Sequence, residues 1–146
     1  MNHISRWAAA AALAAIAVLA LLLREPDEAW LPTILTGAVL LAGAWIISPA
    51  FRGPHTPWAR LQEETGRTGR VVIFWRPGCM YCLRMMAMLG LSGRKAHWVN
   101  IWRDTAAAEF VRTHNAGKET VPTVILAGDV LTNPGPGLVK QALAKG

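Results

Sequence analysis

The sequence predicts an α/β domain that follows two transmembrane helices, and three observations lead to this prediction. The chain has 146 residues, of which 53% are hydrophobic and 16% are charged, a balance too apolar for a disordered protein and high for a soluble domain. The apolar surplus is concentrated in two uncharged runs near the N-terminus. The rest of the chain alternates short β-branched runs with segments rich in helix formers, as α/β domains do.

The N-terminal region predicts a transmembrane helical hairpin over residues 1–48. Residues 7–23 and residues 31–47 are uncharged runs of 17 residues each, at the lower limit of what crosses about 30 Å of hydrocarbon as a helix. A polar turn over residues 24–30 joins the two runs. A cleavable signal peptide is the alternative interpretation of the first run.

Residues within and beside the two runs predict their packing and orientation. Gly37, Gly43 and the many alanines leave little bulk, which favours close helix packing in lipid. Cations precede the first run and follow the second, whereas the turn between the runs holds one arginine and three acids. By the positive-inside rule, we expect both termini and the following domain on the cytoplasmic side of the plasma membrane.

Residues 49–69 are expected to form a linker, because six of them are proline or glycine. Thr56-Pro57 can begin a short helix that runs to about Thr65, with Gly66 as its stop. From Phe51 onward there are 13 Lys/Arg and 6 Asp/Glu, a net charge of +7. This excess favours attraction to an anionic membrane surface. Nucleic-acid binding is the alternative, but the cations are scattered and form no nucleic-acid motif, so we expect no nucleic-acid partner.

The segment 70–146 predicts a domain built around a βαβ unit. Residues 71–75 form a continuous β-branched and aromatic run, typical of a strand buried on both faces. Residues 83–89 are helix formers closed by Gly90, and residues 96–101 form a second strand. Because the connection is long enough for one helix, we expect the two strands to be parallel.

The remaining elements complete a mixed four-stranded sheet with flanking helices. Asp104 is expected to cap a helix over residues 105–115, with Gly117 just past its end. Residues 120–126 form an apolar strand with a proline near its start, where proline is tolerated. The last elements are a hairpin turn at Gly128-Asp129, a short strand at residues 130–131 and a helix over residues 138–145.

Cys79 and Cys82 lie where the strand over residues 71–75 gives way to a helix. Two cysteines exclude a disulfide-rich scaffold, and C-x-x-C at such a junction is typical of a redox site. A cysteine in the first turn of a helix faces unpaired N–H groups and the positive end of the helix dipole, which favours its thiolate. Such cysteines have pKa values of about 3.5–7.5, against roughly 8.5 for a free thiol. Arg76 adds positive charge nearby.

The spacing of the two cysteines predicts their roles. Cys82 comes three residues after Cys79, on the same helical face and within disulfide reach. We therefore expect Cys79 to be the nucleophile and Cys82 to be the resolving thiol. Half of a zinc site, an inert structural disulfide and two idle buried cysteines are the alternatives. We expect no bound metal, because the four histidines form no close pair.

Residues 70–146 resemble a glutaredoxin of the thioredoxin-like fold, through the C-x-Y-C sequence, the βαβ unit, the T-V-P sequence, the hairpin and the last helix. Arg76 lies three residues before the first cysteine, where glutaredoxins often carry Lys or Arg. Met80 departs from the Pro or Gly usual between the cysteines. Several stretches look like the mycoredoxin branch, which serves bacteria whose low-molecular-weight thiol is mycothiol: residues 99–104, 108–111, 115–124 and 131–134.

The resemblance implies a site and an activity. The Val121–Pro122 bond would be cis, and the Val121 backbone would pair with the thiol substrate. Tyr81 would flank the thiol, and Thr132 and Asn133 would bind its polar end. The activity would be a thiol–disulfide oxidoreductase with no bound cofactor and with mycothiol or glutathione as co-substrate. Its partners would be proteins with mixed disulfides, the small thiol and the reductase of that thiol.

The membrane anchor lies outside this resemblance and leaves two other hypotheses open. One is an extracytoplasmic thioredoxin-like thiol oxidase or reductase. The other is a membrane adaptor whose thioredoxin-like domain binds a partner without catalysis.

Overall fold

The structure of the chain is a computed structural model that describes residues 3–23, 29–65 and 70–145. It divides into two compact units, Met1–Arg52 and Gly53–Gly146. Residues 24–28 of the polar turn predicted over residues 24–30, and the predicted helix stop at Gly66, lie outside the described residues.

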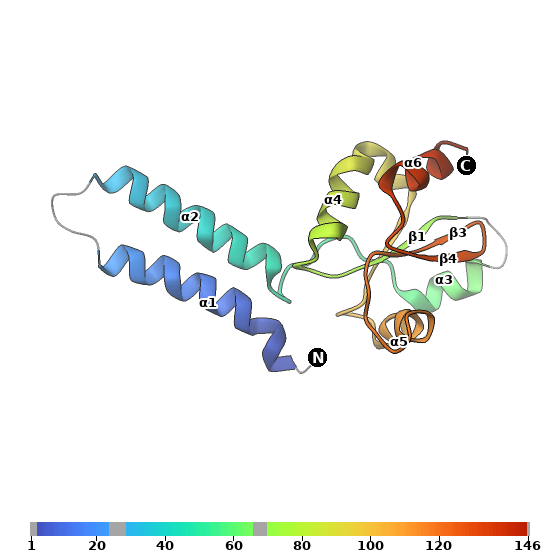
Figure 1. Cartoon of the computed structure of the whole chain (residues 1–146), viewed down its shortest axis with the longest axis horizontal. Coiled ribbons are helices and arrows are strands. Elements are labelled where there is room, and N and C mark those ends of the chain that lie inside the picture. Colours follow the sequence, from blue (N-terminus) through green and yellow to red (C-terminus); the bar gives the residue numbers. More distant parts are fainter. Residues whose placement is uncertain (1–2, 24–28, 66–69, 146) are drawn as a thin grey trace. The chain divides into compact units, whose positions relative to one another are not determined.

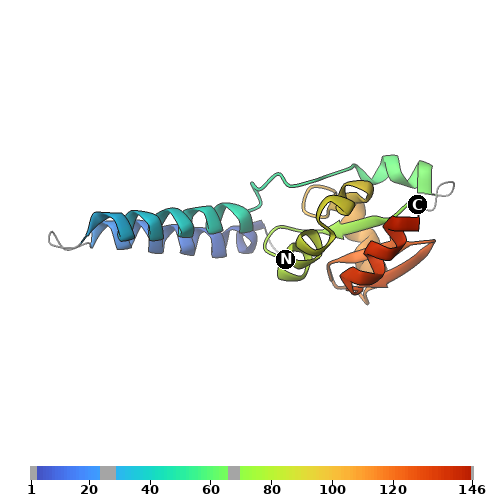
Figure 2. The same cartoon turned by 90° about the horizontal axis from the view of Figure 1, so that it is seen from above.

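The first unit contains two helices, α1 (His3–Leu22) and α2 (Trp30–Ile47), which lie side by side (Figures 1 and 2). Among the side chains described for the two helices, the buried ones are the small side chains of Ala10, Ala17 and Ala44, and the C-cap residue Ser48 is buried as well. A Cβ added to Gly37 would come within 3.6 Å of the Leu21 side chain, whereas one added to Gly43 would meet nothing within 4 Å. The close packing predicted from small residues therefore involves Gly37 but not Gly43.

Only part of this unit has the length of a membrane span. Among the residues described, α2 is long and apolar enough to cross a membrane, with a mean hydropathy of 1.8 over 18 residues. The apolar part of α1, Trp7–Leu22, is shorter.

The second unit is built on a four-stranded sheet of order β2-β1-β3-β4. β1 pairs in parallel with β2 and antiparallel with β3, and β3 pairs antiparallel with β4. The mixed sheet, the βαβ unit and the thioredoxin-like fold are thus confirmed. All four residues of β1 are buried, as expected of a central strand. The strands are β1 (Val72–Trp75), β2 (His97–Asn100), β3 (Thr123–Leu126) and β4 (Asp129–Thr132).

Helices cover both faces of this sheet (Figure 1). The helices α4 (Met80–Leu89) and α6 (Pro136–Lys145) share one face with the 3₁₀ helix η1 (Gly90–Lys95), whereas α3 (Trp58–Thr65) and α5 (Thr105–His114) share the other. The sequence did not predict η1. α6 begins two residues before its predicted start, at a proline, which is favoured in the first turn of a helix.

The β3–β4 hairpin turns one residue earlier than predicted. Leu126 pairs with Asp129, so the two turn residues are Ala127 and Gly128 rather than Gly128 and Asp129. Their φ angles of +53° and +94° suit a two-residue turn whose twist matches that of the strands. The register of β3 on β4 determines where the turn lies, and the local sequence does not reveal that register.

Trp58, which lies in the segment predicted as a linker, is part of the hydrophobic core of the second unit. Its ring centre is 5.0 Å from that of Phe74 and 4.8 Å from that of Phe110. Its backbone N–H donates to Oδ2 of Asp104 at 2.8 Å, while Oδ1 of Asp104 accepts from the N–H of Ala107 at 3.0 Å. Asp104 therefore caps α5, as predicted, and also the start of α3.

The residues just before α3 also pack on the sheet. The N–H of Thr56 donates to the carbonyl oxygen of Trp98 at 2.7 Å. The N–H of Asn100 donates to Nδ1 of His55 at 3.3 Å, and Nε1 of Trp75 donates to the carbonyl oxygen of Pro54 at 2.8 Å. These bonds explain why the compact unit begins at Gly53.

Candidate active site

Cys79 lies at the N-cap of α4. The chain leaves β1 through Pro77 and Gly78, and Gly78 has a φ of +72° that favours glycine. The Sγ of Cys79 accepts a hydrogen bond from the backbone N–H of Cys82 at 3.1 Å. One unpaired N–H group of the helix start is thereby satisfied. A negative charge on this sulfur would lie at the positive end of the helix dipole, which stabilises a thiolate.

Cys82 lies one helical turn further on and is disulfide-bonded to Cys79, with the two Cα atoms 5.2 Å apart. Cys79 is 9% exposed, and Cys82 is 0% exposed. The pair is therefore asymmetric, because Cys79 keeps a small exposed fraction and Cys82 has none.

The backbone of Val121 lies opposite Cys79. Its carbonyl oxygen is 3.3 Å from the Sγ of Cys79, and the Val121–Pro122 bond is cis, as the family resemblance implied. The carbonyl oxygen of Pro122 accepts a hydrogen bond from the N–H of Asn133 at 2.7 Å. The loop before β3 is thus held between Cys79 and the loop that follows β4.

Arg76 belongs to an ion-paired cluster. Its Nη1 is 3.9 Å from Oε2 of Glu119, and its guanidinium carbon is 5.9 Å from the ring centre of Trp102. Oε1 of Glu119 accepts a hydrogen bond from Nη1 of Arg112 at 2.7 Å. The positive charge predicted near Cys79 is therefore partly neutralised. Sequence reasoning missed Glu119, although an acid just before the T-V-P sequence was a visible signal.

Tyr81 and Asn133 line a small pocket beside α4, with a volume of about 130 Å³. The structure thus brings together two of the residues that the resemblance assigned to the thiol. Thr132 is not among the lining residues, and its hydroxyl donates to Oδ1 of Asn115 at 2.6 Å. The other lining residues are Arg84, Met85, Pro134, Gly135 and Pro136.

Together these features define a thiol–disulfide oxidoreductase of the thioredoxin-like fold. A sulfur activated by a helix N-terminus can attack a disulfide, and a second sulfur within bonding reach can release the product.

Comparison with known proteins identifies the family. Residues 71–131, which lie within the second unit, match the Glutaredoxin family. Two Mycobacterium tuberculosis proteins, from strains CDC 1551 / Oshkosh and ATCC 25618 / H37Rv, are named as candidate glutaredoxins. Each is 42% identical to this chain over 79 residues, which is 53% of this chain and 94% of the relative. The chain belongs to the glutaredoxin family and is a thiol–disulfide oxidoreductase.

Proposed function

We propose that this enzyme reduces mixed disulfides between proteins and mycothiol from a membrane-anchored, cytoplasm-facing domain. The observation that carries the proposal is the placement of Cys79. Its sulfur caps α4, borders the surface and lies opposite the Val121 backbone. A substrate disulfide can therefore approach a sulfur that the helix activates.

Cys79 acts as the nucleophile in this proposal. Its thiolate attacks the mycothiol sulfur of the mixed disulfide, so that the Cys79–mycothiol disulfide forms and the protein leaves as a thiolate that takes up a proton. A second mycothiol then attacks this intermediate, which yields mycothiol disulfide and regenerates the Cys79 thiolate. Alternatively, Cys82 attacks Cys79 and releases mycothiol, leaving the Cys79–Cys82 disulfide to be reduced by further thiol. The electrons come from the small thiol, which its own reductase regenerates.

The pocket beside α4 supports mycothiol as the small thiol. Tyr81 and Asn133 offer hydroxyl and amide groups, and none of the seven lining residues is an acid. Glutathione carries two carboxylates, with which Arg84 can pair, and an ammonium group, for which these residues offer no acid. Mycothiol is uncharged and rich in hydroxyl groups, so hydrogen-bonding partners are sufficient for it. The stretches that resemble mycoredoxins support the same choice. In this proposal Val121 pairs with the thiol through its backbone, and Thr132 holds the turn that carries Asn133.

The first unit supports the membrane anchor. α2 has the length and hydropathy of a span, and α1 packs against it through small side chains. We place the anchor in Met1–Arg52 and the catalytic unit in Gly53–Gly146, in line with the two compact units. The sequence predicted a division into residues 1–48, a linker over residues 49–69 and a domain over residues 70–146, and the proposed catalytic unit includes most of that linker.

Serine substitutions test the catalytic roles. In the full chain, Cys79→Ser is expected to abolish turnover of a protein–mycothiol mixed disulfide, because Cys82, the other cysteine of the sequence, is completely buried. Cys82→Ser is expected to retain turnover, because a second mycothiol can complete the monothiol cycle. Full turnover in Cys79→Ser, or none in the unmodified protein, would refute the catalytic assignment.

Comparison of electron donors tests the choice of thiol. Steady-state reduction of one test disulfide is measured with mycothiol, glutathione and a protein reductase in turn. The proposal requires the highest kcat/KM with mycothiol. A preference for glutathione would leave the enzyme class intact and overturn the thiol assignment.

Reporter fusions test the side of the membrane. A reporter that is active only in the cytoplasm is fused after Gly146 or after Pro26. The proposal expects activity from the Gly146 fusion and none from the Pro26 fusion. The opposite pattern would favour the extracytoplasmic oxidase or reductase.

A further inference from the structure

Five of the eleven Lys and Arg residues described in the second unit lie on elements that share one face of the sheet. The sequence suggested scattered cations, but the elements α4, η1 and α6, which share a face (Figure 1), contain no Asp or Glu. The opposite helices α3 and α5 contain residues of both signs. All the Lys and Arg side chains of the first face are exposed: Arg84, Arg94, Lys95, Lys140 and Lys145.

Apolar side chains protrude among these cations. Leu91 of η1 is 82% exposed, Met88 of α4 is 50% exposed and Leu138 of α6 is 49% exposed. We call the surface formed by α4, η1 and α6 the η1 face. Exposed aliphatic groups set among cations are typical of surfaces that enter the headgroup region of an anionic bilayer.

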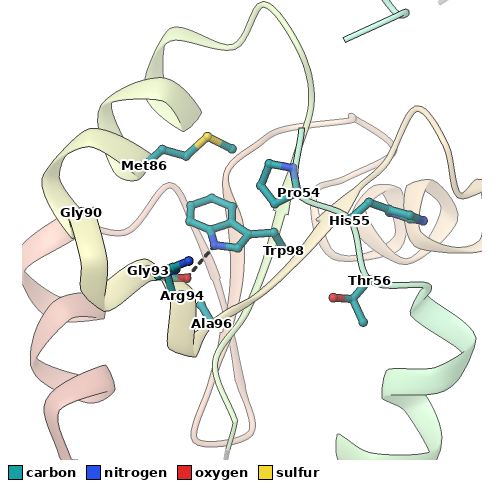
Figure 3. A pocket seen from close by; sticks show the side chains of 9 residues that line it. All are labelled: Pro54, His55, Thr56, Met86, Gly90, Gly93, Arg94, Ala96 and Trp98. Atoms are coloured by element: carbon teal, nitrogen blue, oxygen red, sulfur yellow. Dashed lines mark hydrogen bonds between the residues drawn. The ribbon is translucent and has the colours of Figure 1, made fainter. Parts of the chain in front are cut away.

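A depression of about 410 Å³ opens at the edge of this face. Figure 3 shows the indole of Trp98 at its centre, with Met86 and Pro54 on either side. The Nε1 of Trp98 donates to the carbonyl oxygen of Gly93 at 2.9 Å, so the polar atom of the ring is satisfied and its apolar surface lines the depression. Arg94 also lines it. An apolar hollow with a cation beside it suits a lipid, which is anionic at one end and apolar at the other.

We infer that the η1 face docks on the surface of an anionic lipid bilayer. The inference rests on the proposed membrane anchor and adds to it a second, reversible attachment through the catalytic unit. The cations of α4, η1 and α6, elements that contain no Asp or Glu, match anionic headgroups, and Leu91 and Met88 supply aliphatic groups that a nucleic acid would not bind.

The course of the chain favours a bilayer over a soluble acidic partner. α2 ends at Ile47, and Pro54, which lines the depression, comes seven residues later. Seven residues reach at most about 25 Å, so an anchor at α2 keeps the unit at a high local concentration next to lipid.

Docking through the η1 end of this face leaves the active site free, whereas Arg84, at the other end of the face, lines the thiol pocket. Cys79 caps the first turn of α4, whereas η1 follows its last turn. A helix of ten residues is about 15 Å long, so contact centred on η1 leaves the Cys79 end open to protein substrates.

Hydrogen exchange of the full chain in lipid nanodiscs tests the inference. One set of discs contains phosphatidylcholine alone, and the other also contains anionic phosphatidylglycerol. We expect peptides from η1 and α6 to exchange more slowly in the anionic discs, and this protection to be lost at high salt because salt screens the attraction. Peptides from α5 should exchange equally in both. Equal exchange of η1 and α6 in both discs would overturn the inference.

Matched variants make the test specific. Arg94→Gln with Lys140→Gln removes two cations of the η1 face and should lower the ratio of docked to free unit by roughly 25-fold, since each such cation contributes about a fivefold factor. Arg103→Gln with Lys118→Gln removes the same charge elsewhere and should leave the protection of α6 unchanged. An equal loss in both variants would refute a specific face. Leu91→Ser, at a highly exposed position, should weaken docking without disturbing the core.

The same discs separate this inference from the anchor. If the chain stays bound to both kinds of disc but hydrogen exchange in η1 and α6 does not depend on anionic lipid, the membrane anchor is supported and the docking inference is refuted. If the chain remains with neither, the anchor fails, and docking fails with it.

Discussion

The Sγ of Cys79 and the carbonyl oxygen of Val121 lie 3.3 Å apart, although 42 residues separate them in the chain. The N–H of Cys82 lies on the other side of that sulfur, at 3.1 Å. A protonated thiol can donate to the Val121 oxygen, whereas a thiolate can accept from Cys82 and from the helix start. The ionisation of Cys79 depends on which set of contacts is stronger.

We predict that the helix contacts prevail and that reduced Cys79 ionises more readily than a free thiol. A charge-assisted hydrogen bond is roughly twice as strong as a neutral one, and the helix dipole adds to it. The expected midpoint lies within the range of about 3.5–7.5 found for cysteines at helix starts. Ultraviolet absorbance of the thiolate measures it, with Cys79→Ser as the control. A midpoint near that of a free cysteine would contradict the proposed activation.

Asn133 is predicted to contribute to thiol binding through its side chain. Loss of one hydrogen bond of about 0.5–1.5 kcal/mol should raise KM for the mixed disulfide by roughly 2- to 10-fold and leave kcat nearly unchanged. Because Asn133 has a φ of +48°, Asn133→Gly keeps the backbone conformation, whereas Asn133→Ala also strains it. Both variants should show the higher KM, but only the alanine variant should be less stable. An unchanged KM in the glycine variant would remove Asn133 from the binding site.

Asp104 is predicted to stabilise two helix starts at once. Asp104→Ala removes the acceptors of both Ala107 and Trp58 and should lower the free energy of unfolding by about 2 kcal/mol, since one cap contributes about 1 kcal/mol. Asp104→Asn keeps one oxygen and should lose about half as much. Urea unfolding of a fragment that begins at Gly53 measures both. Equal losses in the two variants would show that only one cap matters.

His55 is predicted to make the second unit less stable in mild acid. Burial, followed by the positive charge of Arg103, lowers the pKa of His55 below its ordinary value of 6.5, against a smaller opposing effect of Asp104. The unfolded chain therefore binds a proton that the folded chain does not, so stability is full above pH 6.5 and falls as the pH drops towards the lowered pKa. His55→Gln should flatten this dependence in the Gly53 fragment, as measured by urea unfolding across pH. The same slope in both proteins would contradict the role of His55.

Local sequence was sufficient for the elements that carry the active site. The buried run of β1, the cysteine at the helix start, the Asp104 cap and the βαβ crossover all depend on residues close together in the chain, and each was predicted. The branch of the family and the roles of the binding residues remain predictions.

The features that the sequence did not reveal depend on contacts between distant residues. Proline and glycine around Trp58 suggested a linker, but its ring packs on Phe74 and Phe110, which no local pattern encodes. Glu119 pairs with Arg76 only because the loops that carry them meet in the folded unit. Likewise, the cations of η1 and α6 form one surface only once the sheet separates its two faces.

The burial of Cys82 determines which of the two cysteines reacts with outside molecules. The sequence offers a substrate disulfide two cysteine sulfurs, but Cys82 is completely buried in the folded protein. Every covalent adduct with an outside molecule is then expected on residue 79, so only one of two isomeric adducts accumulates. A single alkylation of the reduced, folded protein should accordingly label that residue and spare its neighbour.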